Sequence, residues 1–521
     1  MSSPSIILIV LDCLRADRVS SNYKNKNMTP FMNKLLENSI HFENCIANST
    51  WTVPSHINMF TGLYQTQKWL ISKSNKKFGN KIPILAEILK DLGYSTISYT
   101  ENPWINRDLE FNRGFDIFLE NWKKPCFKIE ESSIFQSSTF FIRKIESILK
   151  KKIKSDKLLR LWEIFKLKVE NSFIYLFLKI YWKYIIFNYK SNTFKELEKL
   201  QSILKSVKNE QPRFLFFNIM ATHVPYMPIK KTRKYFGLST RDFKLMKKFL
   251  IYPLNITISI NFQSKTLSNK IVNLNKKFYN TCVYFSDLII NKIISILKDS
   301  GLSDNFYLII TSDHGEHLCD KSDHYLKGHG VPHSVYESLI KVPLIIYNSN
   351  FKKRIVKNQV ELKDLFHTIL HLTGVTSDKN RYLIKKNSLI NQINNNSTPK
   401  YIFGEHIKSK ENTIAIINNL GRKIKKELIP RLLSNISFLR SNNYKYIKFY
   451  NGIEEFYDLS IDPFEQVNLI NENNKNYREM KIYLEKLIKN IHNTKDIVIL
   501  ITEKEKELLN KSINRRKITG I

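Results

Sequence analysis

The chain has 521 residues, of which 42% are hydrophobic, and this composition excludes a disordered protein and a membrane-embedded helical bundle. Its 83 Lys and Arg residues outnumber 47 acidic residues and give a formal net charge of +36. The basic residues are spread along the chain, with no RNA-binding signature and no Cys/His finger spacing, so we expect no nucleic acid partner. The charge favours an anionic substrate or an anionic membrane surface.

Near the N-terminus, residues 6–11 form an apolar run that is too short for a signal peptide or a transmembrane helix. We interpret this run as a buried strand. The five cysteines are scattered without paired spacing, which gives no disulfide framework and indicates a reducing compartment. We therefore predict a cytoplasmic protein without a transmembrane segment.

Short apolar runs typical of strands buried on both faces of a parallel sheet recur along the chain. They cover residues 6–12, 94–102, 214–223, 306–315 and 341–348. Helical patterns lie between them, at residues 30–39, 82–93 and 287–301. Strands and helices that alternate in this way predict an α/β domain with a largely parallel sheet. In such sheets, ligands bind at the carboxyl ends of the strands.

A further helix is predicted from the segment TWTVPSHINMFTG at residues 50–62. Pro54 suits the first helical position, and Gly62 is a helix terminator. Thr52 then lies just ahead of a helix N-terminus, where free N–H groups and the helix dipole favour an anion. His56 follows in the first turn. The segment is either a capped helix and nothing more, or a nucleophile beside an anion site.

Residues 120–210 interrupt the alternation with a stretch rich in Lys and aromatic residues, whose apolar side chains recur at helical spacing. We predict a helical insertion. Its most apolar part, residues 173–187, is short for a membrane span. The alternatives are a helical hairpin packed on the main domain and a helix that contacts a membrane surface.

The C-terminal part has a different character. Residues 443–459 place Asn451 and Gly452 between two alternating, aromatic-rich runs, which is a strong signal for a β-hairpin. We expect a small antiparallel sheet there, and charged helices from about residue 475 onward. The predicted organisation is a main α/β domain over residues 1–375 and a C-terminal region over residues 376–521.

Three of the predicted strands end in side chains that can bind a metal. These are Asp12, His223 and the pair Asp313–His314. Because the carboxyl ends of parallel strands meet at one edge of the sheet, we expect these side chains to converge. Mixed oxygen and nitrogen ligands suit a divalent cation. The alternative is that they are ordinary polar caps of buried strands.

Seven segments, in this order, resemble segments of the sulfatase family within the alkaline-phosphatase superfamily. They read LIVLDCLRADRVS, TWTVPSHINMFTGLY, ENPWINRDLEFNRGFD, NIMATHVPYMP, TSDHGEHL, GHGVPHSVYESLIKVPLI and EEFYDLSIDPFEQVNL. The resemblance covers most of the chain. It implies an alkaline-phosphatase-like fold, in which a mostly parallel sheet is flanked by helices and followed by a small C-terminal antiparallel sheet subdomain.

The resemblance also implies roles for individual residues. The implied metal ligands are Asp12, Thr52, Asp313 and His314. Thr52 falls on the position of the catalytic nucleophile, and His56 takes the place of an arginine that orients this nucleophile. His223 and His329 fall on positions that contact substrate oxygens or protonate the leaving oxygen. Arg15 is a further candidate for contact with the anionic group.

The sequence departs from the family pattern at three of these positions. Cys13 replaces a second aspartate after Asp12, and we expect it to be a small buried hydrophobe. His314 replaces an asparagine. Thr52 stands where the usual sulfatase has a Cys or Ser that becomes formylglycine, and threonine cannot form that aldehyde. Threonine at this position is similar to the related phosphoglycerol and phosphoethanolamine transferases.

The predicted function is a metal-dependent hydrolase of sulfate or phosphate esters, with Thr52 as the nucleophile. The alternatives are a phospho-group transferase that acts on a glycan or lipid, and a non-catalytic binding protein that retains the fold. The expected cofactor is a divalent ion, Ca²⁺ first and Mn²⁺, Mg²⁺ or Zn²⁺ as alternatives. The expected partner is an anionic ester, such as a sulfated or phosphorylated glycan, with membrane-surface contact through residues 120–210 as a further possibility.

Overall fold

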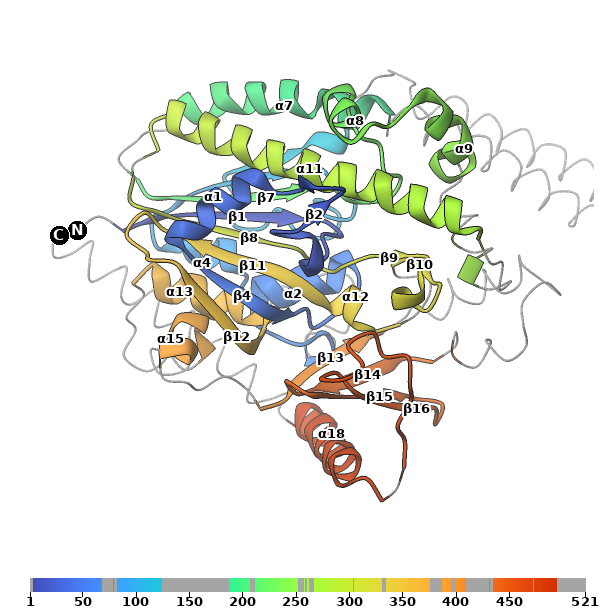
Figure 1. Cartoon of the computed structure of the whole chain (residues 1–521). Helices are drawn as coiled ribbons and strands as arrows, with labels where there is room; N and C mark the ends of the chain where they lie inside the picture. The colour runs from blue at the N-terminus through green and yellow to red at the C-terminus, as the bar shows by residue number, and fades with distance from the viewer. Residues whose placement is uncertain are drawn as a thin grey trace, which may run out of the picture.

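The computed structural model of the chain describes residues 3–67, 82–123, 187–206, 211–251, 267–302, 304–329, 334–374, 387–394, 400–407, 434–471 and 473–493, and the single residues 78, 257, 260, 261 and 431. Within these residues the chain has a mixed α/β fold, with a large sheet between two layers of helices (Figure 1). A smaller antiparallel sheet follows near the C-terminal end. The predicted fold class is confirmed.

The central sheet has eight strands in the order β12-β4-β11-β8-β1-β7-β5-β6. In chain order these are β1 (Ser5–Leu11), β4 (Ser39–Ile46), β5 (Ser95–Thr100), β6 (Ile117–Glu120), β7 (Arg213–Ile219), β8 (Phe306–Thr311), β11 (Lys341–Tyr347) and β12 (Arg354–Glu361). Strands β8, β1, β7, β5 and β6 are parallel to one another. Their carboxyl ends therefore meet at one edge of the sheet.

The predicted direction of one strand was wrong. Residues 341–348 were assigned to the parallel set, but β11 is antiparallel to both β8 and β4. Its apolar run reflects burial in the middle of the sheet, and burial does not depend on strand direction. The sequence patterns also missed β4 and β12, because charged and polar residues interrupt their apolar positions, and β6, because it has only 4 residues.

Helices cover both faces of the sheet because the side chains of its central strand alternate between two apolar clusters. Ile6, Leu8 and Val10 of β1 belong to one cluster. This cluster packs under α2 (Thr52–Thr61), α4 (Leu85–Asp91), α13 (Leu365–Leu372) and α15 (Leu389–Asn394). The next residues along β1 belong to the opposite cluster, under α1 (Pro30–Leu35), α7 (Phe187–Ser206), α11 (Asn269–Asp299), α8 (Lys230–Phe236) and α9 (Thr240–Ile251).

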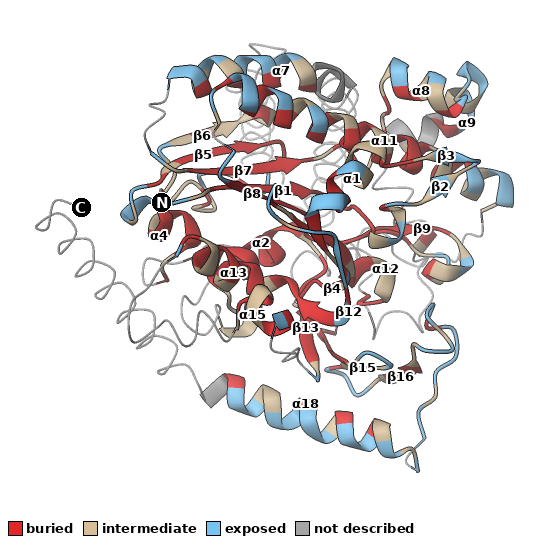
Figure 2. Cartoon of the chain, turned by 60° about the vertical axis from the view of Figure 1, so that its left-hand side comes forward, coloured by how far each residue is buried: buried red, intermediate tan, exposed pale blue. Residues whose placement is uncertain are grey.

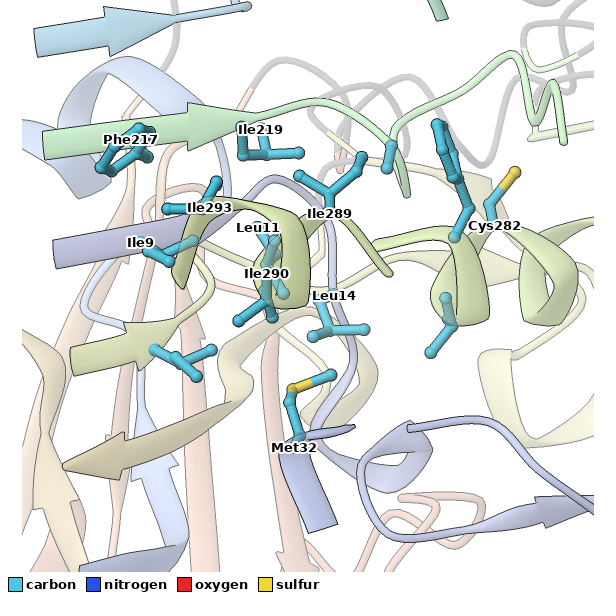
Figure 3. Packing of buried hydrophobic residues seen from close by; sticks show 14 of the residues in the cluster. Ile9, Leu11, Leu14, Met32, Phe217, Ile219, Cys282, Ile289, Ile290 and Ile293 are labelled. Carbon is cyan, nitrogen blue, oxygen red and sulfur yellow. The ribbon is translucent and has the colours of Figure 1, made fainter. Parts of the chain in front are cut away.

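Helix α11 is the longest described helix, and it extends well beyond the predicted residues 287–301. Figure 3 shows its residues Ile289, Ile290 and Ile293 beside side chains of β1 and β7. Among the described helices, α11 alone is long and apolar enough to cross a membrane, and 72% of its apolar window is buried inside the fold. Its apolar face is thus explained by packing on the sheet.

The C-terminal sheet contains β13 (Ile402–His406), β14 (Ile436–Arg440), β15 (Tyr444–Phe449) and β16 (Glu454–Asp458), in that order and all antiparallel. The predicted hairpin is confirmed, because Gly452 has a φ of 93° in the turn between β15 and β16. The predicted helix near residue 475 is α18 (Lys475–Asn493), whose outer face is exposed (Figure 2).

The C-terminal sheet is packed against the main sheet through the short helix α12 (Glu337–Ile340). Leu339 of α12 and Phe438 of β14 share an apolar cluster. Glu337 accepts hydrogen bonds from Arg440 Nε at 3.0 and 3.2 Å, and its Oε1 lies 3.3 Å from Lys445 Nζ. Ion pairs therefore join the C-terminal sheet to α12, which leads directly into β11 of the main sheet.

Four further strands among the described residues are only two residues long. The short strands form two ribbons, β2 (Asn22–Tyr23) with β3 (Lys26–Asn27), and β9 (His317–Leu318) with β10 (Lys327–Gly328).

The helical insertion predicted at 120–210 lies outside the described residues, except for 120–123 at its start and α7 at its C-terminal end. The boundary predicted after residue 375 falls in the undescribed stretch 375–386 and stays a prediction.

Candidate active site

Adjacent strands β1 and β8 bring Asp12, Asp313 and His314 together, as the strand ends predicted. All three side chains are fully buried. One ligand atom from each lies within 4.8 Å of the others. Two ligands of one ion can lie no farther apart than twice the bond length, and ligand bonds to divalent cations are about 2.0–2.6 Å long. The three side chains are therefore close enough to share one ion.

The hydrogen bonds of this cluster leave acceptor atoms facing one another. His314 Nδ1 lies 2.9 Å from the backbone oxygen of Gly315 and donates to it, which leaves the lone pair of Nε2 free. This Nε2 is 3.4 Å from Asp313 Oδ2 and 3.9 Å from Asp12 Oδ1. Neither His314 Nε2 nor Asp313 Oδ2 has a hydrogen-bond partner among the described residues. Buried acceptors without donors fit a cation between them.

The surroundings set the ionisation of these three groups. Burial raises the pKa of Asp313, and the neighbouring Asp12 carboxylate raises it further. Burial alone would also raise the pKa of Asp12, but the nearby imidazoles lower it to about 2. Burial lowers the pKa of His314 to about 3, so its imidazole is neutral near pH 7. A neutral imidazole and an ionised carboxylate are the forms that bind metals.

Thr52 lies beside this cluster as the first residue of α2, and its side chain is buried. Asn102, which follows β5, donates through Nδ2 to Asp12 Oδ2 at 2.6 Å and to Thr52 Oγ1 at 3.3 Å. The helix begins at Thr52 and not at Pro54, so the prediction of its first residue was wrong. Gly62 ends the helix in the left-handed conformation, as predicted.

His56 contacts the backbone of Thr52 and not its hydroxyl. Its Nδ1 is 2.8 Å from the backbone oxygen of Thr52, and its Nε2 is 3.4 Å from Asn218 Nδ2. Burial lowers the pKa of His56 to about 4, so the ring is neutral near pH 7. A neutral ring can hold the start of α2 in place, but it does not supply the charge of the arginine that it replaces.

His223 and His329 lie over the same edge of the sheet. Their ring centroids are 4.8 Å apart, and the ring of His329 is 4.5 Å from that of His314. Glu316 Oε2 is 2.7 Å from His329 Nδ1. Burial alone would lower the pKa of His329, but the Glu316 carboxylate outweighs it and raises this pKa. Burial lowers the pKa of His223.

Asn102 and Glu316 were not among the predicted site residues. Asn102 follows the weakest predicted strand, and an asparagine after a strand is commonly part of a turn. Glu316 follows Asp313 and His314 in a run of polar residues. It reaches His329 because the ribbon of β9 and β10 brings the two segments together. Both residues lie within segments of the sequence that resemble family motifs, and this is the signal that could have found them.

A comparison with known protein families identifies the family of this chain. The family model described as Sulfatase matches residues 4–375. The chain belongs to the sulfatase family. Members of this family are sulfuric ester hydrolases, and the matched residues contain Asp12, Thr52, Asp313, His314 and the other predicted site residues.

Individual sulfatases match different shares of the chain. A sulfatase of Formosa agariphila is 25% identical over 50% of this chain, so the match spans about half (47%) of that relative's length. Arylsulfatase K of Mus musculus is 21% identical over 97% of this chain and 82% of its own length.

Two solved structures share the fold. The phosphonate monoester hydrolase of Agrobacterium radiobacter is 15% identical with a TM-score of 0.60, over 94% of this chain and 96% of that one. A protein solved in complex with its substrate D-glucosamine-2-N,6-O-disulfate is also 15% identical with a TM-score of 0.60, over 94% of this chain and 99% of that one.

In this sulfatase-family chain, the guanidinium of Arg15 is bound to protein groups. Arg15 Nη2 is 2.9 Å from Asp17 Oδ2, and Nη1 is 2.8 Å from Asp323 Oδ1. Nη1 also donates to the backbone oxygen of Glu316 at 3.2 Å. A contact between Arg15 and a substrate anion would compete with these ion pairs. Its role in substrate binding stays a prediction.

Cys13 is fully buried, as predicted, but its neighbours are polar. Its Sγ is 3.1 Å from Asp12 Oδ1 and 3.4 Å from His329 Nδ1. By contrast, Cys45 and Cys282 are packed inside the two large apolar clusters. The polar neighbours were not predicted, and they arise because a cysteine that directly follows a predicted metal ligand shares the surroundings of that ligand.

Proposed function

We propose that this protein is a metal-dependent hydrolase of sulfate or phosphate esters in which Thr52 is the nucleophile. The observation that carries the proposal is the position of Asn102, whose side chain donates both to Thr52 and to Asp12. This shared donor links the hydroxyl to a buried group of potential ligands. Asp12, Asp313 and His314 would hold the cation, and Asn102 keeps the Thr52 hydroxyl beside them.

Different residues of the chain have different roles in the proposed reaction. A bound cation would neutralise charge on the ester oxygens and lower the pKa of the Thr52 hydroxyl. Thr52 Oγ1 gives its proton to solvent and forms a bond to the sulfur or phosphorus as the bond to the ester oxygen breaks. Attack of water on this intermediate then releases sulfate or phosphate and restores the Thr52 hydroxyl. The N-terminus of α2 supplies N–H donors for the negative charge that develops. His329, whose pKa is raised by the Glu316 carboxylate, gives the leaving oxygen its proton.

A sulfated or phosphorylated glycan is the substrate class that we favour. One protein with the same fold was solved with a glucosamine disulfate as its substrate. The net charge of +36 on this chain would attract such an anion. Contact with a membrane surface through residues 120–210, and a cytoplasmic location, stay predictions.

A transferase is the second candidate, and Thr52 is the observation that favours it. Threonine is the nucleophile type of the related transferases that the sequence resembles. In that case the phospho group on Thr52 would pass to an alcohol of a glycan or lipid, and not to water. The two candidates share every step up to the covalent intermediate.

The test is a panel of esters offered to chelator-treated protein that has been reloaded with single divalent cations. The panel contains an aryl sulfate, a phosphate monoester, a phosphodiester and a phosphonate ester, each with and without a sugar alcohol as acceptor. We expect turnover of at least one sulfate or phosphate ester that stops when the chelator is present. Product that appears on the acceptor would favour the transferase. Turnover unaffected by the chelator would refute metal dependence.

A further inference from the structure

The thiol of Cys13 lies inside the candidate metal site. Its Sγ is 3.1 Å from Asp12 Oδ1 and 3.4 Å from His329 Nδ1. We infer that Cys13 is a ligand of the cation, and that the centre therefore binds a borderline-soft cation such as Zn²⁺ in preference to Ca²⁺. This inference rests on the proposed function, because it requires that a divalent cation binds at Asp12.

Distances alone put the thiol in reach of an ion. Ligand atoms of Cys13 and His314 lie within 4.8 Å of each other, and so do those of Asp12, Cys13 and His223. Cys13 and His314 are fully buried. The Nε2 of His314 has no hydrogen-bond partner among the described residues, and this is an independent sign that a cation binds there. A sulfur and a nitrogen donor are thus close to one another and sealed from water.

The backbone around Cys13 holds the thiol at this position. Cys13 has a φ of 66°, a left-handed conformation that is uncommon for residues other than glycine. Its N–H points to Asp313 Oδ1 at 3.4 Å, and its backbone oxygen accepts a hydrogen bond from Tyr279 at 2.7 Å. Such strained conformations persist where the surrounding structure fixes them, and they are frequent at functional sites.

The chemistry of the donor atoms decides which cation is preferred. Ca²⁺ takes oxygen ligands, whereas thiolate and imidazole suit Zn²⁺. Binding would convert the Cys13 thiol to a thiolate: the S–H bond breaks, one proton goes to solvent, and a sulfur–metal bond forms. Since a thiolate and a carboxylate carry the same charge, Cys13 replaces the aspartate of the family pattern without changing the charge of the ligand set.

Cobalt substitution gives a direct readout of the thiolate. Chelator-treated protein is titrated with Co²⁺, and a sulfur-to-cobalt charge-transfer band is followed in the near ultraviolet. We expect the band in the wild type and in Cys45→Ser, whose thiol lies in an apolar cluster. We expect no band in Cys13→Ser. Zn²⁺ affinity, measured by competition with a chromophoric chelator, should fall at least about tenfold in Cys13→Ser, or about 1.4 kcal/mol.

A second variant tests the choice of cation. Cys13→Asp restores an oxygen donor, and it should strengthen Ca²⁺ binding while it weakens Zn²⁺ binding. Should either variant fail to fold, X-ray absorption of the zinc-loaded wild type decides the question, because a cysteine ligand places sulfur at about 2.3 Å from the zinc. A zinc spectrum without sulfur at that distance would overturn the inference.

The outcomes separate this inference from the proposed function. Co²⁺ that binds without the charge-transfer band, or a band that persists in Cys13→Ser, overturns ligation by Cys13 and leaves the metal-dependent hydrolase standing. A wild-type protein that binds no divalent cation overturns both. A wild type that binds Ca²⁺ more tightly than Zn²⁺ overturns the predicted preference.

Discussion

The side-chain nitrogen of Asn102 lies 3.3 Å from Thr52 Oγ1 and donates a hydrogen bond to it. The same nitrogen donates to Asp12 Oδ2 at 2.6 Å. One amide group therefore fixes the distance between the proposed nucleophile and a proposed metal ligand. Loss of this group should leave both partners present but poorly oriented toward each other.

We predict that Asn102→Ala lowers kcat on the best ester by about 10- to 100-fold, because groups that orient ligands and nucleophiles contribute on this scale. KM should change much less. Steady-state kinetics and the metal content of the purified variant are the measurements. Asn22→Ala, at an exposed position of β2, is the control. Unchanged kcat in the metal-loaded Asn102→Ala enzyme would show that the hydrogen bond does not orient Thr52.

Thr52→Ala should lower kcat by about 10³-fold or more, because the attacking group is removed. Melting temperature should change little, and most of the metal affinity should remain because Asp12, Asp313 and His314 still hold the cation. Thr52→Ser should keep part of the activity, since the hydroxyl remains. Thr61→Ala, at the other end of α2, is the matched control. Mass spectrometry of the peptide that contains Thr52 should detect added phosphate or sulfate during turnover. Wild-type rates in Thr52→Ala would mean that another nucleophile attacks.

The buried cation of Lys445 provides a test of the contact between α12 and the C-terminal sheet. Its Nζ lies 2.7 Å from Glu465 and 3.3 Å from Glu337, and its side chain is fully buried. Lys445→Met removes the cation from the buried Glu465, while Glu337 keeps its ion pair with Arg440, and we expect the variant to lower the free energy of unfolding by about 3–5 kcal/mol.

The matched control for this prediction is on the same strand. Lys448 pairs with Glu485 at 2.9 Å near the surface, so Lys448→Met should cost less than about 1 kcal/mol. Denaturant titrations of the two variants measure the difference. Equal effects in both variants would show that burial does not govern the strength of these ion pairs.

Asp287 should make stability depend on pH. It lies on α11 and accepts hydrogen bonds from the N–H groups of Phe31 and Met32 at 2.8 Å. Burial raises the pKa of Asp287 from 3.8 to about 6. Between these pH values the unfolded chain releases a proton that the folded chain retains. The stabilising contribution present at low pH is therefore lost as pH rises through about 6.

Replacement of Asp287 by Asn should remove this pH dependence. We expect the stability of Asp287→Asn, relative to the wild type, to rise between pH 4 and about pH 6. Urea unfolding at several pH values measures the change. Asp304→Asn, at an exposed position, is the control. A constant difference between the wild type and Asp287→Asn over this range would contradict the raised pKa.

Sequence patterns predicted the parts of the fold and site that depend on local order. Apolar runs located β1, β5, β7 and β8, and the residues that follow β1 and β8 proved to share one site. The direction of β11 was not predictable, because a central strand is equally apolar whether it runs parallel or antiparallel.

Contacts between distant segments explain the remaining misses. Glu316 acquires a role only because the ribbon of β9 and β10 brings it to His329. Asn102 acquires one only because β5 ends beside α2. The polar character of Cys13 likewise depends on three strand ends that meet in space. No local pattern of residue types predicts these contacts between distant segments.

The loop that carries Asp313 and His314 is held by α12 as well as by the sheet. The N–H of Gly315 donates to Leu339 at 2.7 Å, and a Cβ at Gly315 would lie 2.0 Å from the backbone oxygen of Ser338. The adjacent Glu337 forms ion pairs with Arg440 and Lys445 of the C-terminal sheet. The C-terminal sheet thus supports the loop that carries Asp313 and His314. A chain cut at residue 375 would keep every proposed ligand and lose the support that keeps two of them in register.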